Sequence, residues 1–324
     1  MTHEKIDVRV PTLARVEGEG ALHVEVDGGE ITDLRLEIFE PPRFFEAFLR
    51  GRGFGEPVDI TARICGICPV AYQMSACAAL EEVLGITVDG PLRQLRQLLY
   101  CGEWIESHTL HIHFLHAPDF LGYPGAIEMA ADHRAVVERA LEVKKIGNDV
   151  VELVGGRAVH PINVKVGGFY KAPSRRDLEP IRERLLRGRD LAAEIVPFVA
   201  GLEFPDQVMD YELVSVDHPT EYPIMGDRVR SDRGLDIPVS EYLGHVEEYH
   251  VEHSTALHAR VIERGDYLVG PLARYSLNAD KLAPIARDAA RAAGLGAECR
   301  NPFQSIIVRA VETLHAFDLA LEVI

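Results

Sequence analysis

The strongest constraint on this fold is a pair of cysteines, Cys65 and Cys68, directly before a helical pattern that begins at Pro69. Nowhere else in the 324 residues do two cysteines lie at chelating spacing. Gly66 follows the first cysteine, and we expect the turn to need it, because glycine tolerates backbone conformations that a Cβ forbids. The positive end of the helix dipole would favour thiolates at this position. The pair therefore predicts either a metal site or a redox dithiol.

The residues alone leave the choice between these sites open. A thioredoxin-like dithiol needs a βαβ unit around it, and the flanking segments lack that alternation. A structural zinc site needs a second pair of ligands at similar spacing, but the other cysteines are single: Cys77, Cys101 and Cys299. Thiolates in general favour soft or borderline metals, namely zinc, iron, nickel or copper(I).

The composition argues against nucleic acid and membrane partners. The formal net charge of -17 disfavours a phosphate backbone as a partner. No apolar run approaches the roughly 20 residues that a membrane-spanning helix needs, and the charged N-terminus does not resemble a signal peptide. Five cysteines with one close pair make no disulfide framework, so we expect a cytoplasmic protein.

Hydrophobic periodicity predicts an α+β class that is mainly helical, with a long central helix bundle and an N-terminal antiparallel sheet. The sequence Asp27-Gly28-Gly29-Glu30 between alternating segments predicts a hairpin. The first helix is expected to begin at Pro42, and Gly188 is expected to interrupt a later one. The expected helices span residues 42–52, 69–84, 91–117, 127–154 (or 131–154), 174–199, 239–257, 281–293 and 303–324.

We expect two parts, a sheet-containing segment over residues 1–60 and a helical bundle over residues 61–324. The bundle would carry a loop-rich insertion near residues 205–238. Its last helix is apolar along its length, and the sequence stops at Val323-Ile324 without a cap, a glycine or a polar tail. The bundle is therefore expected to be incomplete at its C-terminal end.

Four histidines crowd the predicted helix over residues 91–117: His108, His111, His113 and His116. At about 100° per residue, His108 and His111 lie roughly 60° apart, whereas His113 points well away from His111. They cannot all bind one ion. We expect most of them to pack and hydrogen-bond within the helical core, with one or two near a site.

A loop from Gly155 to Pro161 combines two glycines with Arg157 and His160. Phosphate binding would require more backbone amides aimed at one point, and no nucleotide-binding fingerprint occurs in the sequence. We therefore expect a conformational role for the loop, with Arg157 shielding or hydrogen-bonding a neighbouring site.

Taken together, these stretches resemble the large subunit of nickel-iron hydrogenases, specifically the cytoplasmic, reversible, pyridine-nucleotide-linked subgroup. The resemblance covers essentially the whole chain. Each motif alone is weak, but four in the family's order are highly specific. The motifs are Arg15-Val16-Glu17-Gly18, Arg63 to Tyr72, Ser107-His108 to Asp119, and Gly155 to Pro161.

The resemblance implies roles for individual residues. Cys65 would be a terminal nickel thiolate, and Cys68 would bridge nickel to an iron that carries cyanide and carbonyl ligands. Glu17 would be the proton relay, a task suited to a buried carboxylate with a raised pKa, and Asp119 would sit above the open coordination position. Glu46 would help to hold a structural magnesium. Further residues near the site would be Arg63, His111 and His116.

Two departures from the family pattern stand out. Tyr72 and Glu19 occupy positions where much of the family has His, a pattern associated with the cytoplasmic subgroup. The family's last motif, a second Cys-x-x-Cys with a His beyond it, is missing, as is the arginine near the open metal position. Two of four nickel ligands are therefore absent, and we expect a truncated chain that cannot assemble the active site alone.

The implied reaction is the reversible oxidation of dihydrogen within a hetero-oligomer. Electrons would pass to a small subunit with iron-sulfur clusters, because this chain has too few cysteines to ligate them, and on to flavin and NAD(P) subunits. An alternative is a metal-free scaffold or quinone-site subunit like that of respiratory complex I. Retention of Cys65 and Cys68 argues against it, and absence of the second pair argues for it. A third possibility is a poorly folded fragment with apolar residues exposed on its last helix.

Overall fold

The computed structural model describes residues 5–40 and 43–324, and it confirms a mainly helical α+β chain. Contacts divide the chain into two compact units. Unit 1 comprises Met1–Arg50 and Ser240–Asp266, and unit 2 comprises Gly51–Val239 and Tyr267–Ile324. The expected start of the first helix, Pro42, lies outside the described residues, and helix α1 spans Arg43–Leu49.

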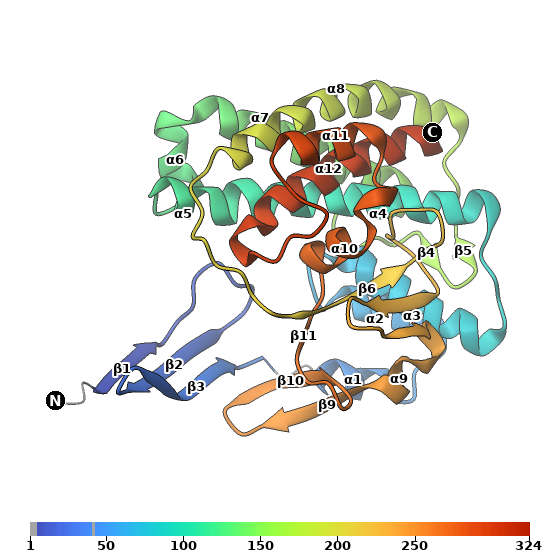
Figure 1. Ribbon diagram of the computed structural model, residues 1–324. Coiled ribbons are helices and arrows are strands. Elements are labelled where there is room, and N and C mark those ends of the chain that lie inside the picture. The colour runs from blue at the N-terminus through green and yellow to red at the C-terminus, as the bar shows by residue number, and fades with distance from the viewer. Residues whose placement is uncertain (1–4, 41–42) are drawn as a thin grey trace. The chain divides into compact units, whose positions relative to one another are not determined.

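Unit 1 contains the N-terminal antiparallel sheet, in the order β1-β2-β3 (Figure 1). The predicted hairpin is confirmed, because Asp27 pairs with Glu30 across Gly28 and Gly29. Both glycines have positive φ, 60° and 89°, as a two-residue hairpin turn requires. The strands are β1 (Lys5–Val10), β2 (Gly20–Asp27) and β3 (Glu30–Ile38).

The predicted helix over residues 239–257 is wrong. Only the single turn α9 (Tyr242–His245) follows a short 3-10 turn, and the chain then forms a hairpin of β9 (Val246–Val251) and β10 (Ser254–Val261). This hairpin is tied to the end of β3. The Ile38 amide donates to Ser254 Oγ (3.3 Å), and Thr255 Oγ1 donates to the Ile38 carbonyl (2.8 Å). Such pairing between distant segments overrides local periodicity.

The core of unit 2 is a bundle of four long helices that pack against one another (Figure 1). Two glycines allow α4 and α7 to approach closely. A Cβ at Gly147 would lie 2.7 Å from the Glu106 amide nitrogen, and one at Gly102 would lie 3.0 Å from the Gly147 carbonyl oxygen. The four helices are α4 (Gly90–Leu110), α7 (Arg134–Gly155), α8 (Arg175–Ala200) and α12 (Ser305–Val323).

Helix α12 is deeply buried between α4, α8 and α11. The exposed apolar face that a poorly folded fragment would show on its last helix is therefore not observed in α12. Phe317 is fully buried, and its ring occupies the space in which a Cβ at Gly188 would lie. The expected interruption of α8 at Gly188 is wrong, because this glycine makes room for Phe317 within an unbroken helix.

Helix α3 (Pro69–Leu84) has 16 residues, and the other elements of unit 2, apart from the four long helices, are shorter. Among the residues that the structure describes, no helix is both long enough and apolar enough to cross a membrane. The remaining helices are α2 (Pro57–Ala62), α3 (Pro69–Leu84), α5 (Ala117–Leu121), α6 (Ala126–Asp132), α10 (Pro271–Asn278) and α11 (Pro284–Ala292). The strands are the pair β4 (Val164–Lys165) and β5 (Gly168–Phe169), and the sheet of β11 (Tyr267–Leu268), β6 (Glu212–Asp217), β7 (Arg228–Ser231) and β8 (Asp236–Pro238).

Candidate functional site

The cysteine pair lies in the turn between α2 and α3, as the sequence predicts. Cys68 is the N-cap residue of α3, and Pro69 occupies its first turn. The sulfur of Cys65 accepts hydrogen bonds from the amides of Ile67 (3.4 Å) and Cys68 (3.2 Å), and this residue is only 6% exposed. Main-chain donors thus fix the sulfur of Cys65. Such support from neighbouring groups is typical of metal-ligating side chains.

Gly66 is not required by the backbone of this turn. Its φ is not in the left-handed region, and a Cβ added to it would meet no other atom within 4 Å. The expectation that the turn needs a glycine is therefore wrong. Instead, the exposed Gly66 leaves one side of the cysteine turn open.

A buried carboxyl group from another helix holds the start of α3. Glu103, on α4, accepts the amide of Val70 with one oxygen (2.6 Å) and the amide of Ala71 with the other (3.1 Å). Burial raises the pKa of Glu103 to about 8, although the two amide bonds act in the opposite direction. This contact is not predictable from the local sequence, because Val70 and Ala71 lie 33 and 32 residues before Glu103.

The loop after α7 braces both ends of the cysteine turn. The Nδ1 of His160 donates to the Ala62 carbonyl (2.8 Å) at the end of α2, and Gln73 Nε2 of α3 donates to the Pro161 carbonyl (2.6 Å). The guanidinium of Arg157 bonds within its own loop, to the carbonyls of Val159 and His160. These bonds are consistent with the conformational role expected of this loop. The side chain that contacts the cysteine turn is His160, whereas Arg157 bonds within the loop itself.

The histidine-rich helix does not stop before Pro118. Beyond α4 the chain makes one π-helical stretch, His111–His116, in which the Ala117 amide donates to the Ile112 carbonyl, and then continues into α5. In an α-helix, residues five apart point about 140° from each other. The wider turn instead stacks His111 on His116, with ring centroids 3.8 Å apart. Such π-turns are frequent at functional sites.

Burial keeps the stacked pair's His111 neutral. Desolvation lowers the pKa of His111 to about 2, and the nearby charge of Arg309 acts in the same direction. The Nδ1 of His111 is buried and finds no hydrogen-bond partner among the residues that the structure describes. This neutral imidazole can therefore form a hydrogen bond through Nδ1 without bringing a positive charge into the site.

A second polar cluster, missed by the sequence reasoning, joins α4, α10 and α12. Glu312 is fully buried, and its carboxylate accepts from Tyr222 Oη (2.7 Å), from both Nε (2.7 Å) and Nη2 (2.8 Å) of Arg274, and pairs with His108 Nε2 (2.8 Å). Burial opposes its ionisation, but Arg274 and His108 hold the pKa of Glu312 well below its ordinary value. One signal was available, since Glu312 is a lone acid in an apolar run.

The structure brings some of the predicted site residues together. Cys65 and Cys68 share one turn, and His111 and His116 share one stack. Asp119 is exposed on α5, within the same unit. Arg63 is exposed at the end of α2.

Two predicted residues belong to unit 1. Glu46 is exposed on α1. Glu17 is exposed in the loop between β1 and β2, in contrast to the buried carboxylate expected of a proton relay. That loop is held by Glu40, whose Oε1 accepts the Glu19 amide (2.7 Å) and whose carboxyl group lies where a Cβ at Gly18 would be.

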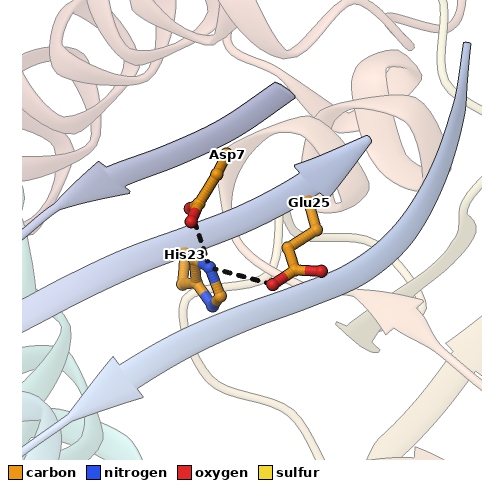
Figure 2. Close-up of side chains that lie close together, drawn as sticks. All are labelled: Asp7, His23 and Glu25. Carbon is orange, nitrogen blue, oxygen red and sulfur yellow. Dashed lines mark hydrogen bonds and ion pairs between the residues drawn. The ribbon is translucent and has the colours of Figure 1, made fainter. Parts of the chain in front are cut away.

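A cluster that the sequence reasoning did not identify lies on the sheet of unit 1 (Figure 2). Ligand atoms of Asp7, His23 and Glu25 lie within 4.8 Å of one another, and His23 Nε2 is 3.0 Å from Asp7 Oδ1. Arg9 donates to Asp7 (3.1 Å), and Lys5 lies 3.3 Å from Glu25. Because these cations already neutralise both carboxylates, we interpret the cluster as a surface ion-pair network.

Comparisons with known proteins all find similarity to hydrogenases. A profile described as nickel-dependent hydrogenase matches residues 43–140. Sulfhydrogenase 1 subunit alpha of Pyrococcus furiosus is 31% identical over 321 residues, which cover 98% of this chain and 75% of that protein. Sulfhydrogenase 2 subunit alpha of the same organism is 38% identical over 234 residues, or 72% of this chain and 57% of that protein.

Solved structures extend the likeness to the fold. An NAD+-reducing nickel-iron hydrogenase in the H2-reduced state superimposes with a TM-score of 0.84 at 25% identity, covering 98% of this chain and 77% of that one. The nickel-iron-selenium hydrogenase of D. vulgaris Hildenborough gives a TM-score of 0.78 at 23% identity, covering 98% and 78%.

Proposed function

Because the chain belongs to the nickel-dependent hydrogenase family, we propose that it is part of a hydrogenase large subunit that serves the reversible oxidation of dihydrogen. The observation that carries this proposal is the turn in which main-chain amides fix the sulfur of Cys65 beside Cys68. A thiol held in this way, with a second thiol three residues on, suits a soft or borderline metal.

The donor set fits half of a nickel-iron centre. Cys65 would hold nickel, and Cys68 would hold both nickel and an iron that carries cyanide and carbonyl ligands. When bound, such a centre supplies the site at which dihydrogen is split heterolytically. The remaining thiolates would come from residues outside these 324, because the sequence holds no second Cys-x-x-Cys. We therefore propose that these residues alone are inactive.

The chain's other side chains would manage protons and charge. Glu17 is proposed as the proton relay, and its exposed carboxylate can exchange protons with water. Asp119 is proposed to sit above the open coordination position. The neutral His111 would offer its Nδ1, which has no partner within residues 5–40 and 43–324, for a hydrogen bond, and its stack with His116 holds the ring in place. Glu46 would supply a carboxylate oxygen to magnesium, a hard cation.

Partners are proposed from the same family membership. One relative is named as a subunit alpha, and one similar structure is of an NAD+-reducing enzyme. We propose that electrons leave to a small iron-sulfur subunit and reach NAD(P) through flavin subunits, in the cytoplasm.

The direct test measures nickel in the complex isolated with all partner subunits. The expected content is about one nickel per complex, and Cys65→Ser or Cys68→Ser should lower it at least about tenfold. Cys77→Ser is the matched control, because Cys77 is buried within α3 and burial raises its pKa to about 11. Negligible nickel in the unmodified complex, or nickel that survives both ligand substitutions, would contradict the proposal. Hydrogen-dependent reduction of a viologen dye should follow the nickel content.

A further inference from the structure

We propose that Glu103 is a positioning residue for the cysteine turn, acting through the first amides of α3. The importance of that turn for a metal rests on the proposed function. The contact itself does not, because it is a feature of the folded chain without any ligand.

The first turn of α3 lacks the cap that helices usually provide for themselves. At most helix starts, the side chain of the N-cap residue accepts an amide of the second or third position. Here the N-cap residue is Cys68, and its side chain makes no capping bond. Pro69 has no amide hydrogen, so the amides of Val70 and Ala71 are the ones that need an acceptor.

Glu103 supplies that acceptor from a different helix. One carboxyl oxygen takes the Val70 amide and the other takes the Ala71 amide, at 2.6 and 3.1 Å. The residue is only 5% exposed, and a buried carboxyl group is costly unless it is hydrogen-bonded. The two amides therefore stabilise Glu103 while Glu103 fixes the helix start.

This arrangement separates two tasks that would otherwise fall on one residue. A serine or aspartate at position 68 would cap α3 with its own side chain, but it would remove the thiol. With Glu103 as the cap, the sulfur of Cys68 is not committed to the helix amides. The amide of Cys68 still donates to Cys65 Sγ (3.2 Å), so a shift of the helix start would also move the first cysteine.

Glu103 also links the cysteine turn to the histidine stack. It lies on α4, which continues directly into the π-helical stretch that carries His111 and His116. The carboxyl group of Glu103 thus fixes the start of α3 relative to the helix that presents the stacked imidazoles. A neighbour one turn along α4, Glu106, binds Lys144 (2.7 Å) instead of α3 and is a matched control.

The test is site-resolved alkylation of the full chain by iodoacetamide under reducing, native conditions, read by mass spectrometry. Three cysteines serve as internal references, because burial raises the pKa of each thiol and keeps it unreactive: Cys77, Cys101 and Cys299. Glu103→Ala should accelerate alkylation of Cys65 and Cys68 by about tenfold, through local opening of the turn, and leave the references unchanged.

Two further variants separate positioning from general stability. Glu103→Gln keeps one acceptor oxygen, so it should give an intermediate acceleration of about threefold. Glu106→Gln should leave the rates of Cys65 and Cys68 within about twofold of the unmodified chain, even though it loses the ion pair with Lys144. If Glu103→Ala does not fold, Glu103→Gln carries the comparison.

Equal acceleration at all five cysteines would overturn the proposal, since it would mean that Glu103 only stabilises the fold. Unchanged rates at Cys65 and Cys68 in a folded Glu103 variant would also overturn it. Because the assay contains no metal, either outcome is independent of the nickel measurement, and the hydrogenase assignment could stand while this role of Glu103 fails.

Discussion

His108 and Glu312 are 204 residues apart in the sequence, yet His108 Nε2 lies 2.8 Å from Glu312 Oε2 in the core of unit 2. The contact connects α4 to α12, and Arg274 completes it from α10 by binding both oxygens of the same carboxylate. A fully buried acid is thereby surrounded by donors. The consequence is that the helix bundle has a charged cluster at its centre that tolerates little change.

Removal of the charge on Glu312 should strongly destabilise the chain. Glu312→Gln leaves the buried guanidinium of Arg274 without a counter-charge, and such losses cost about 3–5 kcal/mol. Tyr222→Phe is the matched variant, because it removes one hydrogen bond to the charged carboxylate and keeps the ring, and it should cost less, about 1.5–3 kcal/mol. Urea unfolding of both variants measures the difference. Equal losses would show that the ion pair with Arg274 contributes no more than the single hydrogen bond from Tyr222.

Stability should fall steeply in mild acid because several histidines are buried in the neutral form. Burial lowers the pKa of His108, His113 and His315 from 6.5 to about 4. Below pH 6.5 the unfolded chain therefore binds more protons than the folded chain. The stability that neutral histidines contribute is complete above pH 6.5 and is lost as the pH falls towards about 4, at about 1.4 kcal/mol per pH unit for each of them.

A single substitution should flatten that dependence. His113 is stacked parallel to Phe198, with centroids 6.1 Å apart, so His113→Phe keeps an aromatic ring and removes the titrating group. The slope of unfolding free energy against pH should decrease by about 1.4 kcal/mol per pH unit between about pH 6 and about pH 5. Urea unfolding at several pH values measures the slope. An unchanged slope would mean that His113 does not titrate between the two states.

The crossing of α4 and α7 should reject any side chain at Gly147. A Cβ there would lie 2.7 Å from the Glu106 amide nitrogen and 2.8 Å from the Gly102 carbonyl, and neither backbone atom can move aside cheaply. Gly147→Ala should cost about 1–3 kcal/mol or more. Gly55→Ala, where a Cβ meets nothing within 4 Å, should change stability by less than about 0.5 kcal/mol. Thermal unfolding measures both variants, and equal midpoint temperatures for Gly147→Ala and Gly55→Ala would contradict the prediction.

Features with local causes were predictable from the sequence. The Asp27-Gly28-Gly29-Glu30 hairpin follows from turn residues, and α3 begins at Pro69 and ends before Gly85, as the sequence signals indicate. The cysteine turn was placed correctly at a helix start for the same reason. Local signals also predicted that α7 ends at Gly155 and Gly156. They predicted that α8 begins near Ser174, which forms a capping box with Asp177.

Features that depend on distant partners were not predictable. The hairpin of β9 and β10 is held by Ile38, more than 200 residues away, and a helical period in the local sequence gave the wrong element. The stack of His111 on His116 requires a change from α-helix to π-helix, and no residue type in this stretch predicts that change. The partners of Glu103 and Glu312 come from other helices. Glu103 binds amides of α3, and Glu312 binds the guanidinium of Arg274 on α10.

The amides of Ile67 and Cys68 both donate to the sulfur of Cys65, and a backbone amide does not depend on the side chain that its residue carries. Selection at this turn should therefore act on the length of the segment more than on its composition. A substitution at position 66, where a Cβ has open space, should be tolerated over evolutionary time. A single inserted or deleted residue would displace both donors and the helix start together, so variation in length should be far rarer here than variation in sequence.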